Sequence, residues 1–85
     1  MNENKVLVKV VVPELDKSYD VFIPINRKIG NIIGLLNKSI SDMNEDCFEI
    51  SNKRCLYNRY TGIRYNFNNL LYETDIRNDS ILILI

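Results

Sequence analysis

Residues 75–85 read DIRNDSILILI, and this stretch decides how the fold can be built. Asp79 and Ser80 predict a turn, and the five residues that follow, 81–85, are all apolar. A strand that alternates apolar and polar side chains usually has one solvated face, whereas a strand that is apolar throughout is covered on both faces or lies in the middle of a sheet. The sequence therefore predicts that residues 81–85 form a central strand.

A second strand of the same kind is predicted near the start of the chain. Residues 5–12, KVLVKVVV, are rich in β-branched side chains. Side chains alternate between the two faces of a strand, so the even positions are expected to face the core; these are Val6, Val8, Val10 and Val12. Placing strands 5–12 and 81–85 side by side and parallel accounts for both apolar patterns. Residues 19–24 follow a short connection opened by Pro13 and predict a hairpin with the first strand.

The hydrophobic period then changes from that of a strand to that of a helix. A helix over residues 28–42 is predicted by one apolar stripe, formed by Ile29, Ile32, Ile33, Leu36, Ile40 and Met43. Gly30 and Gly34 each weaken such a helix by about 1 kcal/mol relative to alanine. We interpret the helix as held by tertiary packing, the alternative being that another backbone approaches closely at the glycines. Shorter strands are predicted at 48–51, 54–60 and 63–65, with a turn at Thr61 and Gly62.

Two sets of residues carry a resemblance to known proteins. Residues 71–84 resemble the ubiquitin-like pattern of a leucine, a short helical turn, an isoleucine, a polar turn and a final strand. Residues 56–65, LYNRYTGIRY, followed by Leu70, IRND at 76–79 and Leu82, are similar to the small bacterial YukD/EsaB-type proteins, which are ubiquitin-like components of type VII secretion loci. The resemblance covers residues 5–85 and implies one domain with an α+β, ubiquitin-like β-grasp fold. In that fold, one main helix packs on one face of a mixed sheet of four to five strands. Residues 1–4 are expected to form a disordered N-terminus.

The resemblance also implies a function. YukD/EsaB-type proteins are accessory or regulatory factors that are not conjugated to other proteins, and the implied partner is a protein of the secretion apparatus. Conjugated ubiquitin-like proteins need a flexible tail that closes in Gly-Gly, whereas no glycine follows Gly62 here and Ile85 ends the predicted strand. We therefore expect a protein-interaction module in the cytoplasm, recruited in some states to the inner face of the membrane.

Several chemistries lack the residues that they need. The sequence has no histidine, which removes the commonest general base and the commonest zinc ligand. Cys47 and Cys55 are too few for the four thiolates of an iron–sulfur cluster, and both are expected to be reduced in a cytosolic chain. No glycine-rich phosphate loop is present, and no apolar run reaches the length of a membrane helix. We expect no enzyme, cofactor, metal, small-molecule substrate or membrane insertion.

The odd positions of the first and last strands suggest a partner site on the outer face of the sheet. These neighbouring positions are Leu7, Val11, Ile81, Ile83 and Ile85. Either loops or a short helix cover them, or they stay exposed as an apolar patch of the kind that marks partner sites. We predict that Leu7, Ile83 and Ile85 form the centre of a contact surface, which could equally make a homodimer.

A basic, tyrosine-rich hairpin at 53–65 suggests the alternative function. Residues 51–71 contain no acid, while Lys53, Arg54, Arg59 and Arg64 are interleaved with tyrosines. Arginine beside tyrosine can stack on bases and pair with phosphates, so RNA binding is the alternative. The same residues are also common as cross-strand pairs of a hairpin. Because the net charge is zero, we favour an acidic protein surface as the counterpart, with Arg59 and Arg64 bordering the apolar centre.

Overall fold

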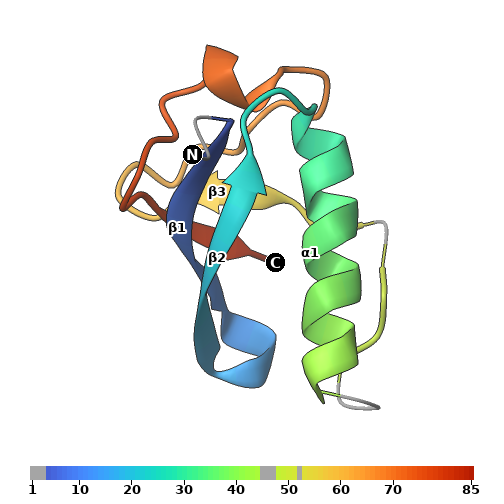
Figure 1. Ribbon diagram of the computed structural model, residues 1–85. Coiled ribbons are helices and arrows are strands. Elements are labelled where there is room, and N and C mark those ends of the chain that lie inside the picture. Colours follow the sequence, from blue (N-terminus) through green and yellow to red (C-terminus); the bar gives the residue numbers. More distant parts are fainter. Residues whose placement is uncertain (1–3, 45–47, 52) are drawn as a thin grey trace.

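The computed structural model describes residues 4–44, 48–51 and 53–85 (Figure 1). Its regular elements are β1 (Lys5–Val12), η1 (Pro13–Leu15), β2 (Lys17–Pro24), α1 (Ile29–Asn44), β3 (Leu56–Asn58), η3 (Leu71–Glu73) and β4 (Ile81–Leu84). Of residues 1–4, for which we expect disorder, 1–3 lie outside the described residues, as does Cys47. The carbonyl oxygen of Asn4 accepts a hydrogen bond of 2.8 Å from the Ile25 backbone N–H.

The four strands form one mixed sheet in the order β2-β1-β4-β3. The two apolar strands lie side by side and parallel, with Lys9 opposite Ile81 and Val11 opposite Ile83, while the other two pairs are antiparallel. Val8, Val10 and Val12 are buried, as the alternation of side chains predicts. The α+β β-grasp arrangement predicted from the sequence is therefore confirmed, with four strands.

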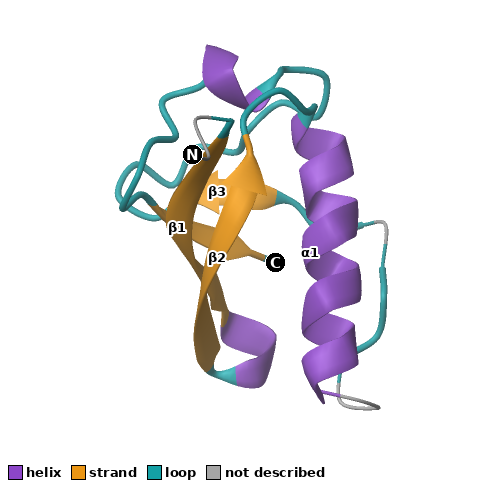
Figure 2. Ribbon diagram, in the orientation of Figure 1, coloured by secondary structure: helices purple, strands orange, loops and turns teal. Residues whose placement is uncertain are grey.

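Helix α1 covers one face of this sheet (Figures 1 and 2). Its buried side chains are those of the predicted stripe, Ile29, Ile32, Ile33, Leu36 and Ile40, together with Asn37. Met43, which the spacing placed on the stripe, is exposed. In the last turn Asn44 makes the contact with the sheet instead, because its side-chain amide donates to the Tyr19 hydroxyl at 2.8 Å. No helix within the described ranges is long and apolar enough to cross a membrane.

The predicted short strands differ from the observed ones. Residues 48–51 are not a strand, and β3 spans three residues instead of 54–60. Residues 63–65 contribute only a single bridge, Arg64 opposite Tyr57. The chain turns directly after β3 because the Gly62 N–H donates to the Asn58 carbonyl at 2.8 Å, with Gly62 at a φ of 72°. A positive φ is readily adopted by glycine, as the predicted turn requires.

Arg54 holds the connection between α1 and β3 against the rest of the domain. Arg54 is 7% exposed, and its guanidinium lies 3.8 Å from the centre of the Phe48 ring. Nη1 donates to Asn37 Oδ1 of α1 at 3.3 Å and to the Glu49 carbonyl, and Nη2 donates to Glu14 Oε1 of η1 at 2.9 Å. The prediction that Arg54 belongs to an exposed basic hairpin is therefore wrong, because its charge is paired inside the fold.

We expect Arg54→Met to lower the free energy of unfolding by about 1–3 kcal/mol, because it leaves the buried Asn37 Oδ1 without its donor. Glu14→Gln is the matched control, and it should cost less than Arg54→Met, because the glutamine Oε1 can still accept from Arg54 Nη2 and every buried polar atom keeps a partner. Urea unfolding curves measure both changes. Equal losses in the two variants would contradict this account of the network.

Candidate functional site

Helix α1 covers one face of the sheet (Figure 1), and the predicted contact residues of β1 and β4 alternate with the buried ones and therefore belong to the opposite face. Leu7, Val11, Ile81 and Ile83 are half-buried there, and Ile85 is 58% exposed. Ile85 is tied to the sheet, because its backbone exchanges hydrogen bonds of 2.7 and 3.1 Å with Cys55. These side chains are therefore accessible to a partner to different degrees. We call this surface the outer sheet face.

Strand register fixes how the outer sheet face is arranged. Ile83 lies at its centre, opposite Val11 of β1 on one side and opposite Tyr57 of β3 on the other. Leu7 lies beside Asp79, whose N–H donates to the Leu7 carbonyl at 2.8 Å. Since Ile85 is six residues further along the chain than Asp79, Leu7 and Ile85 mark opposite ends of a face roughly 20 Å long. The structure thus brings Ile83 and Ile85 together and places Leu7 apart from them.

Two further apolar side chains belong to the outer sheet face. Phe22, opposite Leu7 in the hairpin, is 64% exposed, and Tyr57 is half-buried beside Ile83. The alternation of residues 19–24 could have indicated Phe22, because it falls between Val21 and Ile23, which point to the core side. No comparable signal indicated Tyr57, whose face depends on its pairing with β4.

Besides the exposed Lys5 at the start of β1, the charged residues of this face include one ion pair and one arginine. Lys9 and Asp20 are 4.0 Å apart, and since both are exposed the pair contributes little. Arg59 lies beside Ile81, because its N–H donates to the Ile81 carbonyl at 3.0 Å. Its side chain lines a shallow hollow of about 450 Å³ together with Val11. Within the part of the chain that the structure describes, Arg59 forms no ion pair.

The structure does not combine Arg59 and Arg64 into one basic patch. The Arg64 guanidinium lies 6.0 Å from the centre of the Phe67 ring and lines a different hollow. Of the four expected cations, Arg54 is buried and paired, so only Lys53, Arg59 and Arg64 are exposed. Among residues 4–44, 48–51 and 53–85, no three acidic or cysteine side chains gather as a metal site would require.

Tyr65 holds the loop that carries Arg59 and Arg64. Its hydroxyl donates to Asp75 Oδ1 at 2.7 Å and accepts from Asn58 Nδ2 at 3.2 Å. Burial, and then the Asp75 carboxylate, raise the pKa of Tyr65 from 10.0 to about 12. The neutral phenol is therefore the form that the fold stabilises. Asn58 also orders the turn, because its Oδ1 accepts the backbone N–H of Tyr60 at 2.8 Å.

Comparisons with known proteins establish the fold. No protein-family profile matches the sequence, and no curated protein matches it significantly. One similar solved chain, from a structure of molecular mimicry of SUMO that promotes DNA repair, has a TM-score of 0.71 and 10% identity over 100% of this chain and 95% of that chain. A chain of the ESX-5 inner membrane complex, free of MycP5, has a TM-score of 0.71 and 17% identity, over 96% of this chain and only 21% of that much longer chain. The ubiquitin-like domain of an Arabidopsis thaliana protein has a TM-score of 0.65 and 20% identity over 96% and 77% of the two chains. The fold is therefore ubiquitin-like.

We expect Tyr65→Phe to lower the free energy of unfolding by about 1 kcal/mol at neutral pH, because it removes the hydrogen bond to Asp75. Since the folded pKa lies above the unfolded one, the contribution of the phenol is complete below pH 10.0 and is lost as the pH rises towards about 12. The wild type should therefore lose its advantage over Tyr65→Phe in that window, in denaturant unfolding followed against pH. Tyr60→Phe is the control, because Tyr60 is exposed. It should change neither the free energy of unfolding at neutral pH nor the dependence of that free energy on pH. A constant difference between wild type and Tyr65→Phe from pH 7 to 12 would contradict the assignment.

Proposed function

We propose that this protein is a non-conjugated ubiquitin-like interaction module of the YukD/EsaB type, which serves a type VII secretion system as an accessory or regulatory factor. Two observations support the proposal. The fold is ubiquitin-like, and residues 56–82 resemble the YukD/EsaB pattern. A fold match within the ESX-5 inner membrane complex agrees with a role beside a membrane-embedded assembly. The protein then acts in the cytoplasm and at the inner face of the membrane, without catalysis.

The accessible outer sheet face is the observation that carries this proposal. Four strands at a spacing of about 4.8 Å over a length of about 20 Å give a flat area of roughly 400 Å². A standard interface buries about 800 Å² per partner, so this face supplies about half of one. Contacts at its border, including Arg59, must supply the rest. A regulatory factor that binds and leaves its partner fits an interface of this size.

The chemistry of the face specifies the partner. Ile83 and Val11 offer an apolar centre, and Arg59 at its border forms no ion pair with the residues that the structure describes. Arginine beside an apolar centre is a frequent energetic hot spot of protein interfaces. The partner of the secretion apparatus therefore presents an apolar side chain with a carboxylate next to it. A second copy of this chain is an alternative occupant of the face.

We expect Ile83→Arg to abolish capture of secretion-apparatus proteins from native lysate of the source organism, because it places a charge at the centre of the outer sheet face. Leu35→Arg is the matched control, since Leu35 is half exposed on α1 in the other layer. Pull-downs with wild type and both variants, analysed by mass spectrometry after circular dichroism has shown that all three fold, make the comparison. Capture by Ile83→Arg equal to that by wild type would contradict the site, and size-exclusion chromatography of the same samples would reveal a homodimer.

RNA binding is the second candidate, favoured by the position of Tyr57 and Arg59 on one accessible sheet face. Arg54 is buried, and of the three cations that remain exposed Arg59 and Arg64 are the arginines, which can both stack on bases and pair with phosphates. For two phosphate contacts on a single strand, affinity would fall about sevenfold between about 50 and 200 mM salt. Under our proposal we expect no saturable binding of single-stranded RNA in fluorescence anisotropy at either salt concentration. Saturable binding with this salt dependence would favour the RNA function.

A further inference from the structure

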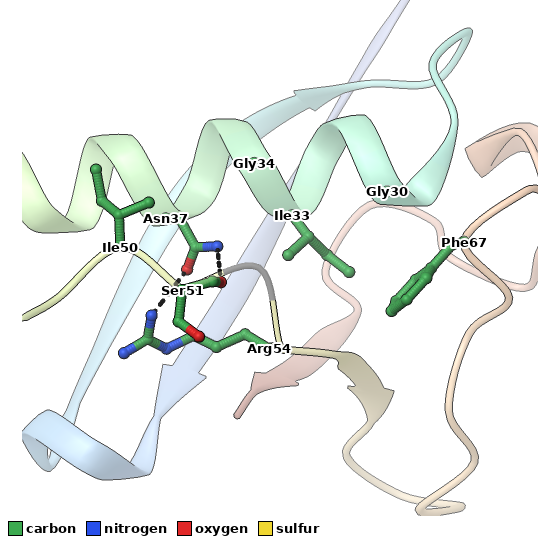
Figure 3. A pocket seen from close by; sticks show the side chains of 8 residues that line it. All are labelled: Gly30, Ile33, Gly34, Asn37, Ile50, Ser51, Arg54 and Phe67. Carbon is green, nitrogen blue, oxygen red and sulfur yellow. Dashed lines mark hydrogen bonds between the residues drawn. The ribbon is translucent and has the colours of Figure 1, made fainter.

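A second accessible apolar site lies in the helix layer, away from the outer sheet face. Figure 3 shows a hollow between α1, the residues Ile50, Ser51 and Arg54, and the loop that carries Phe67. Its volume is about 250 Å³, and Ile33 of α1 lies in its apolar lining. Ile50 and Phe67 form opposite walls, and they are 64% and 41% exposed. We call this site the α1 hollow.

The two glycines of α1 have different roles in the α1 hollow. At Gly30 the chain's own loop packs against the helix, because the Gly30 N–H donates to the Phe67 carbonyl at 3.1 Å. A Cβ added at Gly30 would lie 3.5 Å from that oxygen, whereas a Cβ added at Gly34 would have no atom within 4 Å. A glycine inside a helix costs about 1 kcal/mol relative to alanine. At Gly34, no atom of the described chain occupies the space beside the helix that the missing side chain leaves open.

The polar residues at one end of the α1 hollow are already paired. Asn37 Nδ2 donates to the Ser51 carbonyl at 2.9 Å, and Asn37 Oδ1 accepts from Arg54. The charge of Arg54 is matched by Glu14 at 2.9 Å. An occupant therefore gains contact with apolar walls and with the Gly34 backbone, and it has no buried charge to neutralise.

The volume selects the kind of occupant. Pockets for small molecules and cofactors usually measure about 300–1,000 Å³, so the α1 hollow falls below that range. A cavity of about 150 Å³ is sufficient to hold benzene. At about 250 Å³ the α1 hollow suits one large apolar side chain, such as leucine or phenylalanine, offered by another polypeptide.

The charges around the α1 hollow indicate which residues should flank that side chain in the partner. Within residues 29–41 of α1, Lys38 is the only charged residue. Lys38 lies four residues after Gly34 and therefore on the same side of the helix. None of the residues that line the α1 hollow is acidic, and Lys53 and Arg64 are exposed near Arg54 and Phe67 of the other wall. The exposed Glu49 precedes Ile50, and the three exposed cations Lys38, Lys53 and Arg64 outnumber it. This excess of cations complements acidic residues next to the apolar anchor.

We propose that the α1 hollow is a docking site for a partner segment in which one large apolar side chain is flanked by aspartate or glutamate. The apolar side chain enters beside Gly34, between Ile50 and Phe67, and the flanking carboxylates face the surrounding lysine and arginine side chains. This site is independent of the outer sheet face, and one domain can therefore contact two partners, or two parts of one partner, through its two layers.

Titration of the ¹⁵N-labelled protein with three synthetic peptides tests the proposal. The peptides are EDLFDE, the basic analogue KKLFKK with the same anchor, and EDASDE, which keeps the acids and lacks the anchor. At about 1 mM peptide, where even a free energy of binding near −4 kcal/mol is visible, only EDLFDE should shift the amide signals of Gly34, Ile50 and Phe67. No shifts with EDLFDE, equal shifts with all three peptides, or shifts confined to Leu7 and Ile83 would overturn the proposal.

Gly34→Leu supplies the matching variant, because its side chain fills the α1 hollow without meeting an atom of the chain near its Cβ. We expect it to fold with a melting temperature at or above that of wild type and to bind EDLFDE at least about tenfold more weakly, a change of about 1.4 kcal/mol. Asn31→Leu, at an exposed α1 position outside the hollow, should bind as wild type does. Ile83→Arg should also bind the peptide normally, which separates this proposal from the function of the outer sheet face. Undiminished binding by Gly34→Leu would overturn the proposal.

Discussion

The parallel pairing of β1 with β4 is the constraint on which the rest of this structure depends. Parallel neighbours cannot be joined by a tight turn, so the chain between them must cross over the sheet. Helix α1, with 16 residues and a length of about 24 Å, makes that crossing and matches the roughly 26 Å of the eight-residue β1. It covers one face of the sheet. Val8, Val10 and Val12 of β1 are consequently buried and Val6 is partly buried against the same core, while the odd positions around Ile83 are left accessible on the outer sheet face.

Much of this fold could be predicted from the alternation of side chains along the strands and from the helical spacing of apolar residues in α1. Val8, Val10 and Val12 fix which face of β1 is buried, and the apolar run at 81–85 requires a central position. Arg54 could not be predicted in the same way. A run of cations usually marks a solvated surface, and burial of this arginine needs Glu14, Asn37 and Phe48 to converge from three distant segments. In residues 48–51, which are not a strand, the Glu49 and Ser51 carbonyls accept side-chain hydrogen bonds from Arg54 and Asn37.

The candidate site was predictable in its composition and not in its layout. Parity places Leu7, Ile83 and Ile85 on one face, and the structure agrees. Their separation depends on the register of β1 against β4, with Lys9 opposite Ile81, which neither strand specifies alone. Arg59 and Arg64 flank a turn that begins directly after the three-residue β3, and they line different hollows. The order of residues 53–65 along the sequence predicted one basic surface, because it does not show how the turn separates the two side chains.

Two arginines five residues apart show how a chain of zero net charge can still select partners. Arg54 forms an ion pair with Glu14 and stabilises the fold, while Arg59 lies beside an apolar face and pairs with no acid among residues 4–44, 48–51 and 53–85. Charges in such positions set orientation and specificity more than affinity. Because the outer sheet face and the α1 hollow are each small, we expect either proposed site alone to support only weak binding. Arg54 joins the two layers, since it lines the α1 hollow and binds the β1–β2 connection through Glu14. Two weak sites held at a fixed separation gain affinity through effective concentration, and a rigid link between the layers is what such a gain requires.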